Sequence, residues 1–150
     1  MTYQHTQTGR LMIFVSLAVV LLFGNILLNT KINTFIFVEM FVILGILVSF
    51  CSLNVMIDEK YLRIKFGYGI FKKRFAIKEI ISAKIVKNHW YYGWGIRYCL
   101  APPMWIYNVS GLDAVEIKTQ DGEIYRIGTD KPENLEYAII QAIKESSKNK

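Results

Sequence analysis

The sequence contains few of the residues that build metal centres, disulfides and proton-transfer sites. Its 150 residues include two cysteines and two histidines. Cys51 and Cys99 lie far apart, and His5, in the short N-terminal tail, is far from His89. This distribution gives neither metal-ligand spacing nor a disulfide framework. We therefore predict a protein without a metal site or a cofactor.

Motifs of the common enzyme classes are missing as well. No phosphate-binding loop, nucleophile elbow or dinucleotide fingerprint occurs. The net charge of +6 is modest, and no basic helix or nucleic-acid-binding motif accompanies it. The sequence thus predicts no catalytic residues, a protein that is not an enzyme, and no nucleic-acid partner.

Charge is almost absent from two long segments. The first lies between Arg10 and Lys31 and has no charged residue. The second lies between Lys31 and Asp58 and has Glu39 as its single charged residue. A helix of about 20 residues spans roughly the 30 Å of bilayer hydrocarbon. We predict transmembrane helices at about residues 11–28 and 35–53. No small-x-small cleavage pattern marks the first as a signal peptide.

The basic residues near these segments predict an orientation. Only Lys31 lies in the short turn between the two helices, whereas five basic residues follow the second helix closely: Lys60, Arg63, Lys65, Lys72 and Lys73. Lys and Arg accumulate on the cytoplasmic side of membrane helices. Both termini are therefore expected in the cytoplasm, with residues 54–150 as a cytoplasmic domain.

Two polar residues lie inside the predicted hairpin. Because the turn is short, Asn25 and Glu39 are expected at similar depth. In one interpretation, Glu39 forms a structural hydrogen bond with Asn25 or with a second copy of the hairpin. In the other, Glu39 handles ions or protons, which requires an oligomer because two helices cannot enclose a pathway.

After residue 54 the apolar pattern changes to alternation, which is the pattern of strands. Asp-Gly at positions 121 and 122 predicts a hairpin between the last two strands. Seven short strands are predicted, at residues 55–57, 61–66, 70–76, 80–87, 104–109, 114–119 and 124–128.

The chain closes with a predicted amphipathic helix. Asp130 is suited to cap it, and Pro132 is suited to its first turn. Apolar residues recur on one face: Leu135, Ile139, Ala142 and Ile143. This face is expected to pack against the strands. The predicted class is therefore α+β, a transmembrane hairpin followed by a β domain with a C-terminal helix.

Seven strands followed by one helix is the element order of a pleckstrin-homology (PH) fold. The runs YYGWGIRY at 91–98, WIYNVSG at 105–111 and KPENLEYAI at 131–139 resemble a family of uncharacterised bacterial membrane proteins with two N-terminal helices and a PH-like domain. The resemblance implies a PH-like sandwich or barrel over residues 54–150 and a multi-pass protein of the bacterial plasma membrane. It transfers no catalytic residues.

An aromatic segment is the main candidate site. Trp90, Trp94 and Trp105 fall in one stretch that also contains Arg97 and Tyr98. The aromatic rings are suited to cover a sheet edge or to lie among lipid headgroups. A third interpretation is a ligand or peptide groove, in which Arg97 binds a phosphate or carboxylate.

Together these features predict a membrane-anchored PH-like binding or scaffolding module. Its expected partners are the lipid bilayer and either another protein or a second copy of the chain. The alternative function is a subunit of a membrane transport or sensing assembly that uses Glu39.

Overall fold

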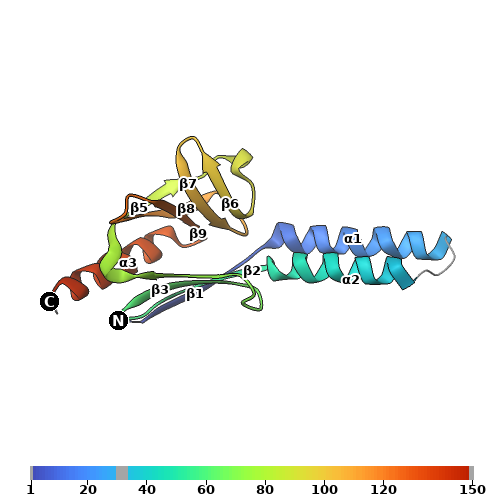
Figure 1. The fold of residues 1–150 in the computed structure, drawn as a ribbon, viewed down its shortest axis with the longest axis horizontal. Coiled ribbons are helices and arrows are strands. Elements are labelled where there is room, and N and C mark those ends of the chain that lie inside the picture. Colours follow the sequence, from blue (N-terminus) through green and yellow to red (C-terminus); the bar gives the residue numbers. More distant parts are fainter. Residues whose placement is uncertain (1, 30–33, 149–150) are drawn as a thin grey trace.

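The computed structural model describes residues 2–29 and 34–148. This part of the chain forms three α-helices, nine β-strands in two sheets, and the short 3-10 helices η1 (Ile77–Glu79) and η2 (Trp90–Tyr92). Two long helices project from one end of a domain that contains both sheets and the C-terminal helix (Figure 1). The predicted α+β class is confirmed.

The projecting helices, α1 (Arg10–Asn29) and α2 (Thr34–Ser49), lie side by side and run in opposite directions (Figure 1). Among the described residues, α1 alone is long and apolar enough to cross a membrane, with 20 residues and a mean hydropathy of 2.7. The helix α2 is apolar but has 16 residues. The turn with Lys31 lies outside the described residues.

The second apolar helix ends earlier than predicted. We expected it to reach residue 53, but α2 stops at Ser49 and a strand begins at Ser52. Leu53 and Val55 are buried on one face of that strand. The apolar residues there belong to the core of the β domain, which is why hydropathy alone extended the helix too far.

The first sheet, sheet A, has the order β1-β2-β3-β4 and is antiparallel throughout. Its strands are β1 (Tyr3–Thr8), β2 (Ser52–Ile57), β3 (Tyr61–Phe66) and β4 (Lys72–Ala76). The strand β1 precedes α1 and pairs with β2, which follows α2. The N-terminal residues predicted as a tail are thus a strand of the domain, and a boundary at residue 54 would cut β2.

The second sheet, sheet B, has the order β5-β8-β9-β7-β6. Its strands are β5 (Ile80–Lys87), β6 (Gly95–Leu100), β7 (Pro103–Asn108), β8 (Asp113–Thr119) and β9 (Ile124–Gly128). The strands β7 and β9 pair in parallel, and the other pairs are antiparallel. The predicted hairpin between β8 and β9 is confirmed.

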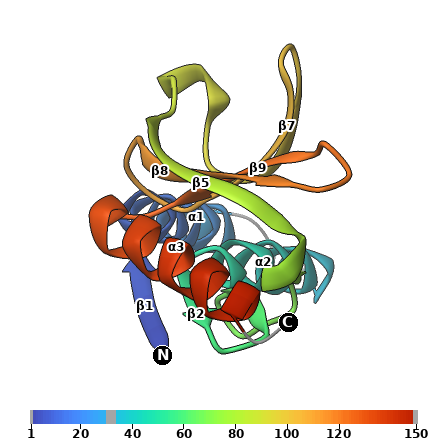
Figure 2. The same ribbon diagram turned by 90° about the vertical axis from the view of Figure 1, so that its left-hand side faces the viewer.

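The core lies between the two sheets and helix α3 (Pro132–Lys148). Figure 2 shows α3 crossing between sheet B and the strands β1 and β2. Leu135 and Ile139 are fully buried, Ala142 is buried, and Ile143 packs against the core. Full burial of a large apolar side chain contributes roughly 1.5–3 kcal/mol. The predicted packing face of this helix is confirmed.

The predicted N-terminal cap of α3, Asp130, does not lie at the cap position. Pro132 is the first residue of the helix, as expected. Asp130 lies two positions earlier, and its carboxylate is hydrogen-bonded to the ring Nε2 of His5 on β1. Asp130 therefore ties the N-terminal strand to the segment before α3.

All seven predicted strands occur, with some ends shifted by one to three residues. The strands β1 and β6 were not predicted, so the described residues contain nine strands. Since β1 is polar, no alternating apolar pattern marks it. The strand β6 lies within the aromatic segment, where no strand was predicted.

Candidate functional site

The outward face of sheet A is basic. Alternate residues of β3 are buried, whereas Arg63 and Lys65 point outward and are exposed. On β4, Lys72 and Arg74 are exposed. The strand register places Arg63 opposite Arg74 and Lys65 opposite Lys72. These four residues are called the basic face below.

The basic face has little compensating negative charge. Arg63 forms an ion pair with Asp58, with an Nη2–Oδ2 distance of 2.8 Å. Backbone N–H groups of Lys60 and Tyr61 and the charge of Arg63 hold the pKa of Asp58 below its usual value. The other three cations have no carboxylate partner within the described part of the chain.

This charge pattern does not favour the stability of the sheet. Like charges directly opposite each other on neighbouring strands are destabilising. Two such cation pairs occur in succession on β3 and β4. The arrangement is instead suited to an anion, because two pairs of donors project from one rigid surface.

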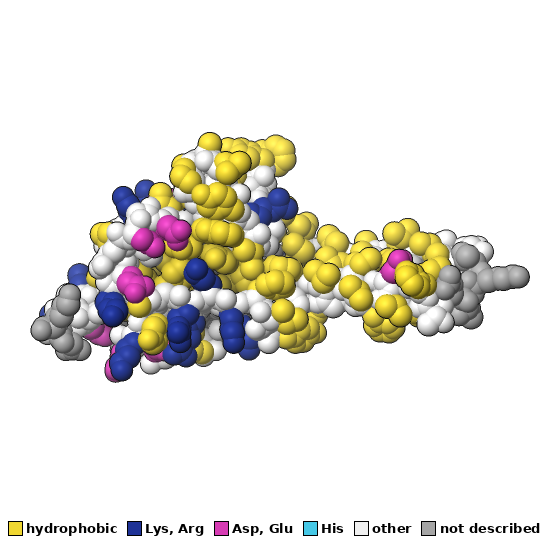
Figure 3. Space-filling view, in the orientation of Figure 1, with side chains coloured by type: hydrophobic (Ala, Val, Ile, Leu, Met, Phe, Trp, Pro, Cys, Tyr) yellow, Lys and Arg dark blue, Asp and Glu magenta, His cyan; other side chains and the backbone are white. Residues whose placement is uncertain are grey.

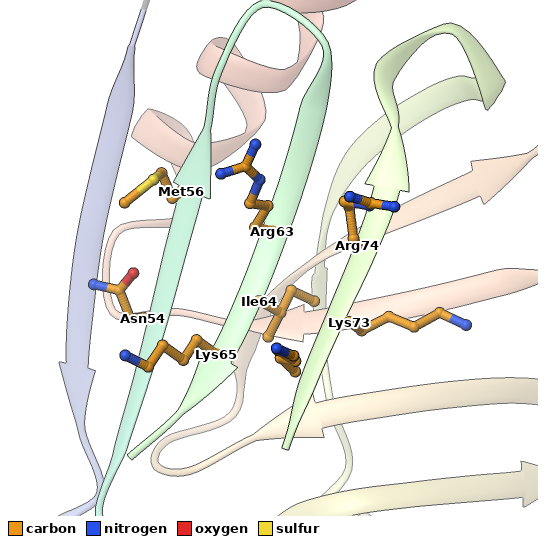
Figure 4. A pocket seen from close by; sticks show the side chains of 8 residues that line it. Asn54, Met56, Arg63, Ile64, Lys65, Lys73 and Arg74 are labelled. Carbon is orange, nitrogen blue, oxygen red and sulfur yellow. The ribbon is translucent and has the colours of Figure 1, made fainter. Parts of the chain in front are cut away.

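The basic face lines an open groove of about 750 Å³, which Asn54 and Met56 of β2 also line. Figure 4 shows Arg63, Lys65 and Arg74 along this groove, with Lys73 pointing away from them. Figure 3 shows Lys and Arg side chains in a row along the same side of the domain.

From the sequence, we counted Arg63, Lys65 and Lys72 for membrane orientation alone and did not consider Arg74. The signal for a common face was nevertheless present in the sequence. Arg63 and Lys65 are two residues apart in one predicted strand, and Lys72 and Arg74 are two apart in the next. Because strand side chains alternate between faces, each pair shares one face of its own strand, and the strand register places both pairs on the same face of the sheet.

The structure brings together only part of the predicted aromatic site. The guanidinium Nε of Arg97 donates to the backbone carbonyl of Trp94, at 3.3 Å. Tyr98 instead packs against Trp105 across β6 and β7, with ring centroids 5.1 Å apart. Trp90 lies in η2 with 76% of its surface exposed.

A charged network lies on the outward face of sheet B. Glu116 accepts from Lys84 at 3.0 Å and from Nε of Arg126 at 2.8 Å. Arg126 also donates to Asn88 at 3.3 Å and lies 5.9 Å from the ring centroid of Tyr92 in η2. The network therefore braces η2 against the sheet.

The electrostatics of Glu116 fit this structural role. Burial raises the pKa of its carboxyl group, but the hydrogen bonds and charges of Lys84 and Arg126 outweigh burial and lower the pKa overall. Glu116 is therefore held ionised, which suits an ion-pair partner better than a proton donor.

The polar residues of the helical pair remain apart. Asn25 accepts hydrogen bonds from Nδ2 of Asn29 at its carbonyl and side-chain oxygens, at 2.9 and 3.0 Å. Glu39 is exposed on α2. Among the described residues, no hydrogen bond joins Glu39 to Asn25.

Within residues 2–29 and 34–148, no group of three or more His, Cys, Asp or Glu residues is placed to hold a metal ion. Comparisons with protein-family models, curated proteins and solved structures found no match to this chain.

Proposed function

We propose that the chain is a membrane-anchored, non-enzymatic binding module of PH-like fold, which binds an acidic protein segment through its basic face. The observation that carries this proposal is the succession of two opposed cation pairs, Arg63 with Arg74 and Lys65 with Lys72. Of these four, only Arg63 has an acidic partner among the described residues.

The anchoring part of the proposal is that α1 and α2 cross the bilayer together. At 1.5 Å per residue, the 20 residues of α1 span about 30 Å. Large apolar side chains on α1 are exposed, among them Phe14 at 69%, Leu21 at 75% and Leu28 at 88%. Apolar surface of this extent is typical of a segment that lipid covers. The apolar helix α2 would return the chain across the membrane.

The pairing of β1 with β2 supports an orientation with both termini on one side. The strand β1 leads into α1 and β2 leaves α2, so both ends of the helical pair join the same sheet. The Lys and Arg residues after α2 favour the cytoplasm for that side. With the family resemblance, this gives a multi-pass protein of the bacterial plasma membrane.

The strand order supports a PH-like fold with two insertions. Without β6 and β7, sheet B is a three-stranded meander of β5, β8 and β9. Sheet A is a four-stranded meander. Apart from β6 and β7, seven strands therefore precede α3, which is the number expected for this fold. In this proposal the helical pair is inserted between the first two strands, and the β6–β7 hairpin follows the fifth.

The direction of the strands favours a protein partner over the membrane surface. The strands β2 and β3 extend from the domain-side end of α1 and α2 in roughly the direction of the helices (Figure 1). At about 3.4 Å per residue, Arg63 lies roughly 7 Å farther from the helices than Lys65. An acidic segment along the strands would contact both cation pairs, whereas a flat bilayer would reach only the nearer pair.

The test uses the full-length protein in phosphatidylcholine nanodiscs and a fluorescent polyglutamate peptide as the probe. The Lys72→Gln/Arg74→Gln variant should weaken peptide binding about tenfold or more, because it removes two charge-assisted contacts. The matched control is Lys118→Gln/Lys144→Gln, which removes the same charge from exposed positions elsewhere. It should change binding less than twofold.

An equal loss in the control would show that net charge, not the basic face, binds the peptide, and would refute the proposal. Binding to phosphatidylglycerol vesicles without any binding to the peptide would assign the basic face to the membrane instead.

Glu39 supports a second candidate, a subunit of a larger transport or sensing assembly. Its carboxylate is exposed on an apolar helix, and a polar group in lipid favours contact with another helix. Glu39→Gln should then reduce the mass of the detergent-solubilised assembly measured by light scattering. An unchanged monomeric mass for both forms would refute this candidate.

A further inference from the structure

The loop 67–71 joins β3 to β4 at the end of the domain from which the helices emerge. The N–H of Phe66 donates to the carbonyl of Phe71 at 2.9 Å, and the N–H of Gly69 donates to the carbonyl of Phe66 at 2.7 Å. Gly67 and Gly69 have φ angles of +42° and +89°, a region that glycine adopts readily. The loop is therefore a well-defined tight turn.

This loop packs directly against the end of α2. The N–H of Gly67 donates to the carbonyl of Ser52 at 2.9 Å. A Cβ atom on Gly67 would lie 2.6 Å from the carbonyl oxygen of Ser49, the last residue of α2. The ring of Phe71 stacks on Phe50, with centroids 5.1 Å apart. The position of the loop relative to the helices is thus fixed by contacts.

The outward side chains of the loop are apolar. Tyr68 is 71% exposed and Ile70 is 68% exposed. The side chain of Lys65 lies against Gly69, beside them. Figure 3 shows hydrophobic side chains continuing from the helices onto the adjoining end of the domain. Exposed aromatic and aliphatic residues next to a basic residue are typical of contacts with the headgroup region.

We infer that the loop 67–71 enters the headgroup region of the bilayer, with Tyr68 and Ile70 as its contacts with lipid. The lipid surface is the occupant because Tyr68 and Ile70 are exposed and their loop packs against the end of α2, next to the exposed apolar side chains of the two helices. This second contact fixes the orientation of the domain relative to the membrane. The inference rests on the proposed membrane anchoring and does not depend on an acidic partner.

The test measures tryptophan quenching by lipids with brominated acyl chains, using the full-length protein in phosphatidylcholine vesicles. Ile70→Trp places a new fluorophore in the loop, and Tyr137→Trp places one at an exposed position of α3 as the matched control. Fluorescence of the wild type is subtracted, because the chain has three tryptophans of its own. The added fluorescence of Ile70→Trp should be quenched at least twice as strongly as that of the control.

Equal quenching at both positions in membrane-inserted protein would overturn the inference and leave the anchoring proposal intact. Protein that alkaline carbonate extracts from the vesicles would overturn both. Tyr68→Trp provides a second reporter in the same loop. If Ile70→Trp fails to fold, as judged by circular dichroism, the quenching of Tyr68→Trp decides the matter.

Discussion

Arg63 and Arg74 lie directly opposite each other on β3 and β4, and both guanidinium groups lie over the ring of Tyr61. The distances to the ring centroid are 5.7 Å for Arg63 and 4.6 Å for Arg74. A cation over an aromatic ring near the protein surface gains about 0.5–1 kcal/mol. Tyr61 therefore offsets part of the repulsion between the two arginines and lets them remain close on one face.

Lys65 and Lys72 form an opposed pair without such an aromatic ring, which predicts a gain in stability when one charge is removed. Lys72→Gln should raise the free energy of unfolding by about 0.2–1 kcal/mol. The gain should shrink in about 1 M salt, because salt screens repulsion between exposed charges. Thermal unfolding of the detergent-solubilised protein at low and high salt measures both effects. A loss of stability at low salt would contradict the prediction.

The network around Glu116 predicts that Glu116→Gln lowers the stability of the domain more than Lys84→Gln does. The side chains of Glu116 and Arg126 are 11% and 15% exposed, whereas that of Lys84 is 66% exposed. Glu116→Gln should destabilise the domain by about 3 kcal/mol, because it leaves a largely buried cation without its partner. The control, Lys84→Gln, removes a surface ion pair and should cost less than about 1 kcal/mol. Denaturant unfolding measures both values, and equal costs would refute the bracing role.

Glu116 also predicts a pH dependence of stability. Burial raises its pKa, but Lys84 and Arg126 lower it below the ordinary value of 4.5. Because the folded-state pKa is the lower one, ionised Glu116 contributes stability that is fully present above about pH 4.5 and is lost as the pH falls through the folded-state pKa. Urea unfolding between pH 7 and pH 3 should show a smaller loss of stability for Glu116→Gln than for the wild type. Identical losses would contradict the prediction.

The parts of the fold with strong local patterns were predictable. The strands Tyr61–Phe66, Ile80–Lys87 and Ile124–Gly128 have the predicted bounds, because each has alternating or continuous apolar residues between turn residues. The buried face of α3 was predictable from its spacing for the same reason. The second apolar helix was placed too long because the strand that follows it is also apolar.

The missed features depend on contacts between residues far apart in the sequence. The strand β1 has the sequence YQHTQT, and it is held by pairing with β2 and by a hydrogen bond from Gln7 to the carbonyl of Ser110 at 2.9 Å. No local pattern reveals such pairing. The basic face was missed because its four cations share a face only once β3 and β4 are paired in register. The aromatic residues, chosen for their clustering in sequence, separate into different contacts.

Gly9 lies between β1 and α1, at the junction of the domain and the helices, and we predict that a larger residue there destabilises the protein. A Cβ atom there would lie 2.9 Å from the carbonyl oxygen of Phe50 and 3.1 Å from that of Val109. The N–H of Gly9 also donates to the carbonyl of Cys51 at 2.7 Å, so the backbone has little freedom to move away. Gly9→Ala should lower the free energy of unfolding by about 1–3 kcal/mol, as overpacking does.

The control is Gly24→Ala in α1, where a Cβ atom meets nothing within 4 Å and alanine favours the helix. Thermal unfolding of the detergent-solubilised protein should show a lower Tm for Gly9→Ala and an equal or higher Tm for Gly24→Ala. A Gly9→Ala protein as stable as the wild type would show that the junction is looser than these contacts require.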